Sequence, residues 1–231
     1  MNILALDTSM GACSAAVLRD YDGAGRALIA RDAEMARGHA ETLMPMVAEV
    51  MAEAELRFDE LDLIAATQGP GSFTGVRIAI AAALGLALVT RAKLYGTDSL
   101  TVMARVALAT GMNPKGPFAV AADARRGMLY FGLYDETGQR LDGPLLIAPD
   151  DAVDLLPIAP SVAVGSGTAL LAEAAARRGK RIEAKLPELQ PSAAALAEIA
   201  RQTDETFPTL RPLYLRPPDA KPQTPLMATR R

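Results

Sequence analysis

The sequence predicts an α/β fold made of two tandem β-β-β-α-β-α units, each forming one lobe. In both halves of the chain, short apolar runs bounded by turn residues are followed by segments with helical periodicity. The first half also recurs in the second, because Leu4-Ala5-Leu6-Asp7 returns as Val120-Ala121-Ala122-Asp123, 116 residues later. These two observations favour a duplicated architecture over a single sheet.

The first unit is expected to open with a three-stranded meander, since three apolar runs are separated by polar and glycine-rich turns. The runs are 3–7, 13–18 and 27–30. Apolar residues at i, i+3 and i+4 then predict a helix over 33–54, with Pro45 accommodated by a kink. A buried strand over 61–67 follows.

A second helix is predicted over 73–90, with Ser72 as its N-cap. Between residues 78 and 89 no polar face remains. Those twelve residues span about 18 Å at about 1.5 Å each, which is too short for a bilayer core of roughly 30 Å, so the helix is expected to be buried in protein. Two stripes of this helix are expected to pack against other parts of the protein. The first consists of small residues, Gly75, Ala79, Ala83 and Ala87, and the second of large residues, Ile80, Leu84 and Leu88.

The second unit is expected to repeat this order, with a strand over 162–164, a glycine turn and an apolar helix over 168–178. The predicted division is an N-terminal lobe over 1–105, a C-terminal lobe over 106–216 and a basic, proline-rich extended tail over 217–231.

Composition excludes several classes of protein. The chain has 231 residues, of which 50% are apolar, so a disordered or fibrous protein is excluded. A net charge of −3 makes the chain alone a poor binder of a nucleic-acid backbone. The single cysteine, Cys13, cannot form an intrachain disulfide, and no signal peptide or membrane anchor is visible, so a cytoplasmic location is expected.

Two motifs resemble parts of a phosphate-binding site. Asp7, Thr8 and Ser9 follow the first strand, where they form either a weak, vestigial phosphate site or simply a stabilised turn. The loop GPGSFTG at 69–75 lacks the lysine of a Walker A motif, so a structural role is favoured for it. The only histidine, His39, cannot form a histidine metal cluster, so no metal site is predicted.

Six motifs follow one another along the chain: LALDTS at 4–9, RGHAETLMP at 37–45, TQGPGSFTGVRIAIAAALGLA at 67–87, GTDSL at 96–100, DARRGMLYFGLYD at 123–135 and PLYLRP at 212–217. In this order they resemble the TsaB family, a group of bacterial accessory proteins for tRNA threonylcarbamoyladenosine synthesis within the actin-like ATPase and sugar kinase superfamily.

The resemblance implies a non-catalytic scaffold, a silent paralogue of the transferase TsaD. It implies that the chain binds TsaD, that a small ATPase, TsaE, completes the assembly, and that tRNA is contacted only within the complex. The reaction supported is transfer of a threonylcarbamoyl group to the adenosine next to the anticodon, in tRNAs that read codons starting with A. No cofactor is required by this chain, ATP or ADP is expected at the complex interface, and the free chain is expected to form a homodimer.

The two helices at 33–54 and 73–90 are expected to form the partner interface, through residues His39, Leu43, Val47, Val50, Arg77, Ile80, Ala81, Leu84 and Leu88. A second function class stays open, a small-molecule kinase or ATPase of the same superfamily that uses Asp7 as its catalytic carboxylate. A glycopeptidase has neither metal ligands nor a nucleophile arrangement in this sequence to support it.

Overall fold

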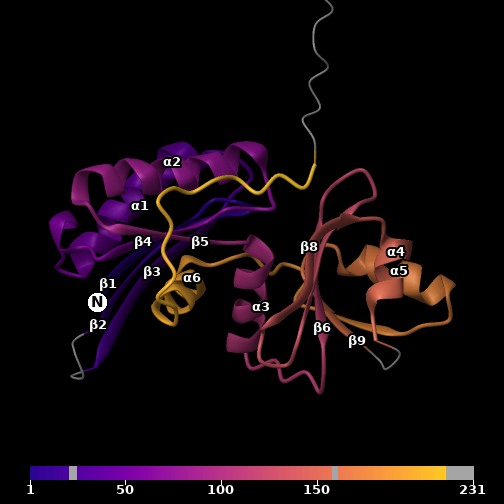
Figure 1. Cartoon of the computed structure of the whole chain (residues 1–231). Coiled ribbons are helices and arrows are strands. Elements are labelled where there is room, and N and C mark those ends of the chain that lie inside the picture. The colour runs from indigo at the N-terminus through magenta and orange to yellow at the C-terminus, as the bar shows by residue number, and fades with distance from the viewer. Residues whose placement is uncertain (21–24, 158–160, 217–231) are drawn as a thin grey trace, which may run out of the picture.

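Two five-stranded mixed sheets lie side by side in the structure, a computed structural model that describes residues 1–20, 25–157 and 161–216 (Figure 1). The first unit contains β1 (Asn2–Asp7), β2 (Ala12–Asp20), β3 (Arg26–Glu34), α1 (His39–Glu53), a 3-10 turn (Phe58–Glu60), β4 (Leu63–Thr67), α2 (Phe73–Thr90), β5 (Lys93–Thr97) and α3 (Ser99–Ala109). The second contains β6 (Phe118–Asp123), β7 (Leu129–Tyr134), β8 (Arg140–Ile147), α4 (Pro149–Leu155), β9 (Ser161–Val164), α5 (Thr168–Arg177), β10 (Ile182–Lys185) and α6 (Ala193–Arg201).

The two sheets have the same strand order, β3-β2-β1-β4-β5 and β8-β7-β6-β9-β10. In each sheet the first strand of the unit is central, antiparallel to the second strand and parallel to the fourth. The predicted duplication is therefore confirmed. Each unit also has one strand and one helix more than predicted, which are β5 and α3 in the first unit and β10 and α6 in the second.

The first helix is shorter than predicted. Apolar spacing favoured a helix over 33–54, whereas α1 spans His39–Glu53. Residues up to Glu34 belong to β3, which pairs with β2 as far as Ala12. Gly38 then adopts a φ of 94°, a left-handed conformation that stops the helix from extending further toward the N-terminus.

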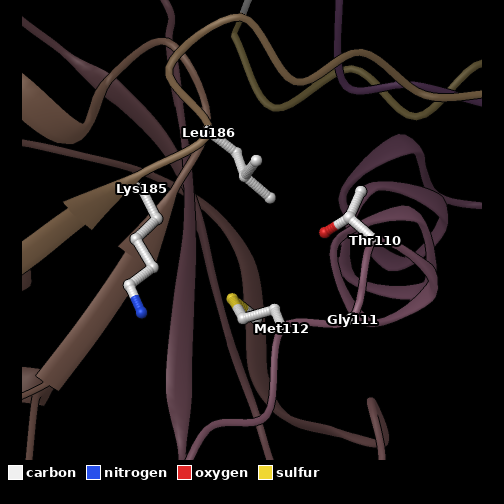
Figure 2. Close-up of a pocket in the computed structure, with 5 residues that line it drawn as sticks. All are labelled: Thr110, Gly111, Met112, Lys185 and Leu186. Atoms are coloured by element: carbon white, nitrogen blue, oxygen red, sulfur yellow. The ribbon is translucent and has the colours of Figure 1, made fainter.

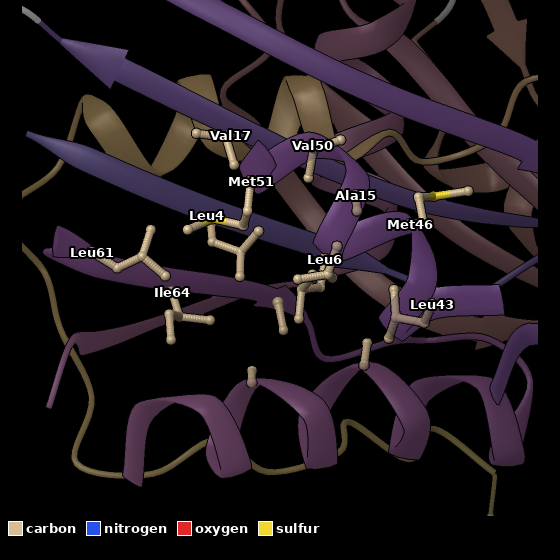
Figure 3. Close-up of a cluster of buried hydrophobic side chains, with 14 of the residues drawn as sticks. Leu4, Leu6, Ala15, Val17, Leu43, Met46, Val50, Met51, Leu61 and Ile64 are labelled. Carbon is tan, nitrogen blue, oxygen red and sulfur yellow. The ribbon is translucent and has the colours of Figure 1, made fainter. Parts of the chain in front are cut away.

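Helices α1 and α2 cover the same face of the first sheet and build its main core. Figure 3 shows Leu43 and Val50 of α1 directed toward strand residues such as Leu6 and Ile64. All four side chains are almost completely buried. Because α1 presents its large side chains to the sheet, most of the apolar pattern that predicted this helix is used inside the lobe.

Helix α2 begins at Phe73 as predicted, with Ser72 Oγ accepting a hydrogen bond from the N–H of Gly75 at 3.3 Å. Within the described ranges it is the one helix long and apolar enough to span a membrane by length and composition, with 28% of its residues buried in the chain. The expected burial therefore holds only for its inward face, which carries the small residues Gly75, Ala79 and Ala83.

Helices α3 and α6 lie between the sheets, and each packs on the sheet of the other unit. Leu196 and Ala200 of α6 are buried against the first sheet, whereas Leu100 and Met103 of α3 are buried with side chains of the second. The predicted boundary between residues 105 and 106 falls inside α3. This exchange of helices gives the two sheets a shared interior.

Polar contacts hold both exchanged helices in place. At the start of α6, the N–H of Ala193 donates to Ser14 Oγ on β2 at 2.7 Å. At the start of α3, the N-cap Asp98 accepts from Arg140 Nη1 on β8 at 2.6 Å, and the Asp98 side chain is only 4% exposed. Each helix therefore depends on the opposite sheet for its first turn.

We expect Gly75→Ala to destabilise the protein, because a Cβ at this position would overlap the backbone carbonyl of Thr8. Overpacking against backbone of this kind costs about 1–3 kcal/mol. The urea midpoint of unfolding measures the effect.

Gly85→Ala is the matched control on the same helix. A Cβ on Gly85 meets nothing within 4 Å, so alanine should leave stability unchanged or raise it by up to about 1 kcal/mol through helix propensity. Equal midpoints for the two variants would contradict the close contact between α2 and the loop after β1.

Candidate functional site

The last residue of β1 and the loop after it carry the three residues predicted to contact phosphate. These residues, Asp7, Thr8 and Ser9, are completely buried. Asp7 Oδ2 accepts hydrogen bonds from Ser9 Oγ at 2.8 Å and from Thr67 Oγ1. Ser99 Oγ donates in turn to Ser9 Oγ at 2.9 Å. The carboxylate is thus bound by hydroxyl groups of this chain.

Burial raises the pKa of the Asp7 carboxyl from 3.8 to about 6, while hydrogen bonds from Thr67 and Ser9 limit the rise. In the part of the chain that the structure describes, no buried side-chain nitrogen or oxygen lacks a hydrogen-bond partner. Asp7 therefore belongs to a buried network whose described side-chain polar atoms all have hydrogen-bond partners.

The glycine-rich loop closes this network from outside. The N–H of Ser72 donates to the carbonyl of Ser9 at 2.7 Å, and Thr8 Oγ1 donates to the carbonyl of Gly75 at 2.6 Å. Gly71 lies so close that a Cβ would overlap the Ser9 carbonyl. The backbone of the glycine-rich loop therefore packs directly against the backbone of Thr8 and Ser9. These contacts favour the stabilised turn, the other predicted alternative for Asp7, Thr8 and Ser9, and binding of phosphate there stays a prediction.

His39, the only histidine of the chain, is the first residue of α1. Its Nε2 lies 3.2 Å from the carbonyl oxygen of Met10. Across residues 1–20, 25–157 and 161–216, no three His, Cys, Asp or Glu side chains are placed to hold a metal ion together. The position of His39 serves to connect α1 with the loop after β1.

Four of the predicted interface residues lie in the core of the first lobe. Their exposed fractions are 0–5%, and the residues are Leu43, Val47, Val50 and Ile80. A side chain that already packs in the core offers no surface to a partner, so we remove these four from the predicted interface. Leu84 is half-buried and packs partly against the same core.

The remaining predicted residues of α2 lie on its exposed side, which we call the outward face. Its members recur at helical spacing and are Phe73, Arg77, Ala81, Gly85, Leu88 and Val89. Leu88 and Val89 are 84% and 82% exposed, far more than large apolar side chains of a closed core. The predicted interface did not include Phe73 and Val89. Because apolar residues surround the helix, the sequence does not show which side of α2 faces the sheet. The single charge, Arg77, was the signal that marks this face.

The C-terminal segment 210–216, here called the strap, runs along α2 toward the second lobe (Figure 1). The N–H of Leu213 donates to the carbonyl of Gln68 at 2.6 Å, and Gln68 Nε2 donates to the carbonyl of Arg211 at 2.9 Å. Arg216 Nη2 then donates to the carbonyl of Ala124 in the second lobe at 3.0 Å. The predicted tail over 217–231 lies outside the described residues.

A cavity of about 320 Å³ lies between the end of α3 and the end of β10 (Figure 2). Its polar side chains are already engaged, since Lys185 Nζ pairs with Glu183 at 3.1 Å and Thr110 Oγ1 donates to the Ala107 carbonyl. The lining thus offers one lysine and one threonine, both already bound within the chain. The outward face of α2 is therefore the stronger candidate site.

Residues 33–207 match the TsaD family, tRNA N6-adenosine threonylcarbamoyltransferase. The chain belongs to this family. It is 34% identical over 221 residues to an uncharacterized protein of Mycobacterium tuberculosis, an alignment that covers 95% of this chain and 94% of that protein. Two further similarities, to a TsaB protein and to a solved YeaZ structure, confirm the predicted relationship to TsaB.

The TsaB-type chain is 36% identical over 140 residues to the tRNA threonylcarbamoyladenosine biosynthesis protein TsaB of Escherichia coli, covering 60% of this chain and 58% of that protein. The solved structure of YeaZ from Pseudomonas aeruginosa superimposes with a TM-score of 0.78 at 30% identity, covering 93% of this chain and 99% of YeaZ. The alignment with the Escherichia coli protein therefore spans little more than half of its length.

We expect Asp7→Asn to remove a pH dependence of stability. Because burial raises the pKa of Asp7 to about 6, the folded state binds this proton more tightly than the unfolded chain. The contribution of Asp7 to stability is therefore greatest below about pH 4 and is lost as the pH rises to about 6. Between about pH 4 and pH 6, the free energy of unfolding of the asparagine variant should therefore rise relative to that of the wild type by about 2–3 kcal/mol.

Urea unfolding of both proteins across this pH range measures the difference. The exposed Asp204→Asn provides the control for loss of one negative charge. Parallel stability profiles for wild type and Asp7→Asn would disprove the raised pKa.

Proposed function

We propose that this chain is a non-catalytic subunit that binds a TsaD-type transferase and thereby supports threonylcarbamoyl transfer to the adenosine next to the anticodon of tRNA. The observation that carries the proposal is the outward face of α2, which exposes large apolar side chains. The proposed reaction is taken from the relatives, since the similar Escherichia coli protein is a tRNA threonylcarbamoyladenosine biosynthesis protein.

The closed loop after β1 supports a non-catalytic role. Asp7, the carboxylate at the position that an actin-like ATPase would use, is completely buried and bound by hydroxyl groups of the chain. The backbone around Gly71 and Gly75 occupies the neighbouring space. An enzyme that transfers a group needs its reacting atoms within reach of the substrate, and these contacts withhold Asp7 from any substrate.

The outward face of α2 supports a protein partner. Complete burial of a leucine or valine stabilises an assembly by about 1.5–3 kcal/mol relative to exposure in water. Leu88 and Val89 are adjacent and almost fully exposed, while Ala81 and Gly85 in the preceding turns leave room for a helix to approach closely. A helix of a TsaD-type protein fits this combination, and a second copy of the chain would cover it in the free state.

The resemblance to the TsaB family implies further partners of the assembly. The net charge of −3 disfavours independent binding of tRNA, so tRNA contact belongs to the assembled complex. A TsaE-type ATPase completes the assembly, and ATP or ADP binds at its interface rather than in this chain.

The alternative, a small-molecule kinase or ATPase, requires Asp7 to reach a nucleotide. The hydrogen bonds of Ser72 and Thr8 across the loop argue against that access. Turnover of ATP by the purified chain, abolished by Asp7→Ala, would favour the alternative over the scaffold.

Reconstitution tests the proposed function directly. We expect the chain alone, supplied with tRNA and threonylcarbamoyl adenylate, to form no modified adenosine with or without divalent metal. Addition of the chain to TsaD-type and TsaE-type partners should produce the nucleoside, as measured by mass spectrometry of digested tRNA. Product formed by this chain alone would contradict the proposal.

Leu88→Glu tests the surface. Because Leu88 is exposed, the variant should fold normally by circular dichroism, yet it should bind the TsaD-type partner at least tenfold more weakly in calorimetry, since a carboxylate would be buried in an apolar contact. Leu141→Glu is the control, at a leucine that is 54% exposed on β8 of the second sheet. Unchanged binding by Leu88→Glu would exclude the outward face as the interface.

A further inference from the structure

One charged residue lies on the otherwise apolar outward face. Arg77 is the only charged side chain of α2. Its guanidinium carbon lies 3.7 Å from the centre of the Phe73 ring, and its Nε donates to the Tyr214 hydroxyl at 2.6 Å. The rings of Phe73 and Tyr214 stack with centres 5.4 Å apart. Two aromatic side chains thus hold the guanidinium in a defined position.

The strap supplies one of these aromatic residues. Tyr214 follows Leu213, whose N–H is bound to the Gln68 carbonyl beside the start of α2. Tyr214 and Phe73 are 45% and 54% exposed, so the pair lies at the surface and is ordered by backbone contacts rather than by burial. The guanidinium is therefore preorganised, which reduces the entropy lost when it binds a ligand.

Arg77 has no acidic partner in this chain as far as the structure describes it. No ion pair of the described residues includes Arg77. Its single hydrogen bond uses Nε, so both terminal nitrogens, Nη1 and Nη2, still have their N–H donors available. These donors form the fork that matches a carboxylate in a bidentate pair.

We propose that Phe73, Arg77 and Tyr214 form a binding site for the carboxylate of an Asp or Glu side chain on a helix of the TsaD-type partner. The inference rests on the proposed function. A partner that covers the outward face takes the Arg77 charge out of water, which is unfavourable unless an opposite charge pairs with it. Because this chain provides no such charge, the partner must provide it.

The chemistry of the site favours a carboxylate over a nucleic-acid phosphate. A nucleic-acid backbone is bound by several cations, each releasing counterions, whereas α2 offers one guanidinium among apolar residues. Ala81 follows Arg77 by one helical turn and Gly85 follows by two, so a helix crossing there would bring its own side chains toward the fork.

Calorimetric titration of the wild type and variants with the purified TsaD-type partner tests the site. We expect Arg77→Gln to weaken binding at least tenfold and Arg77→Lys to recover only part of the loss, because an ammonium group cannot form the bidentate pair. Tyr214→Phe, which keeps the ring stack and removes the Nε contact, should weaken binding less than Arg77→Gln. The exposed Arg91→Gln, at the other end of α2, should bind like the wild type.

The two proposals fail in different ways. If the wild type does not bind the TsaD-type protein at all, the proposed function is wrong. If the wild type binds and Arg77→Gln, folded by circular dichroism, binds equally well, the carboxylate site is wrong. Loss of self-association by Arg77→Gln with unchanged partner binding would also overturn the proposal, since the occupant would then be a second copy of the chain.

Discussion

The close approach of α2 to the loop after β1 is the contact on which the rest of the structure depends. It requires glycine at two positions, because a side chain on Gly71 or Gly75 would overlap the carbonyls of Ser9 and Thr8. Once Gly75 faces the loop, helical geometry directs Ala79 inward and Arg77 outward. The same contact therefore fixes the loop after β1 and sets the face that α2 presents to solvent.

Burial of an ionisable group under this contact is tolerated because its hydrogen bonds are complete. Asp7 accepts from Ser9 and Thr67, and Ser99 extends the network to the start of α3. Desolvation nevertheless raises the pKa of Asp7, so the network remains electrostatically unfavourable in part. Through this network Asp7, at the end of β1, links the following loop, β4 and the start of α3.

Contacts between distant parts of the chain make the two units interdependent. Helices α3 and α6 pack on each other's sheets, and the strap connects the start of α2 to the second lobe. The strap also completes the outward face, because Tyr214 lies 137 residues from Arg77 in sequence yet binds its Nε. The candidate interface is thus assembled from two remote segments, and its geometry depends on the whole fold.

The sequence by itself determined the duplicated α/β architecture, the N-cap of α2 at Ser72 and the family, since these depend on local patterns and on motifs in order. It did not determine which side of α2 is exposed, because apolar residues surround the helix and periodicity then carries no direction. Only tertiary structure decided that Val47 and Val50 are core residues, that Leu88 is exposed and that Tyr214 reaches Arg77. Those outcomes depend on contacts between segments that are far apart in the chain, and a local pattern contains no record of such contacts.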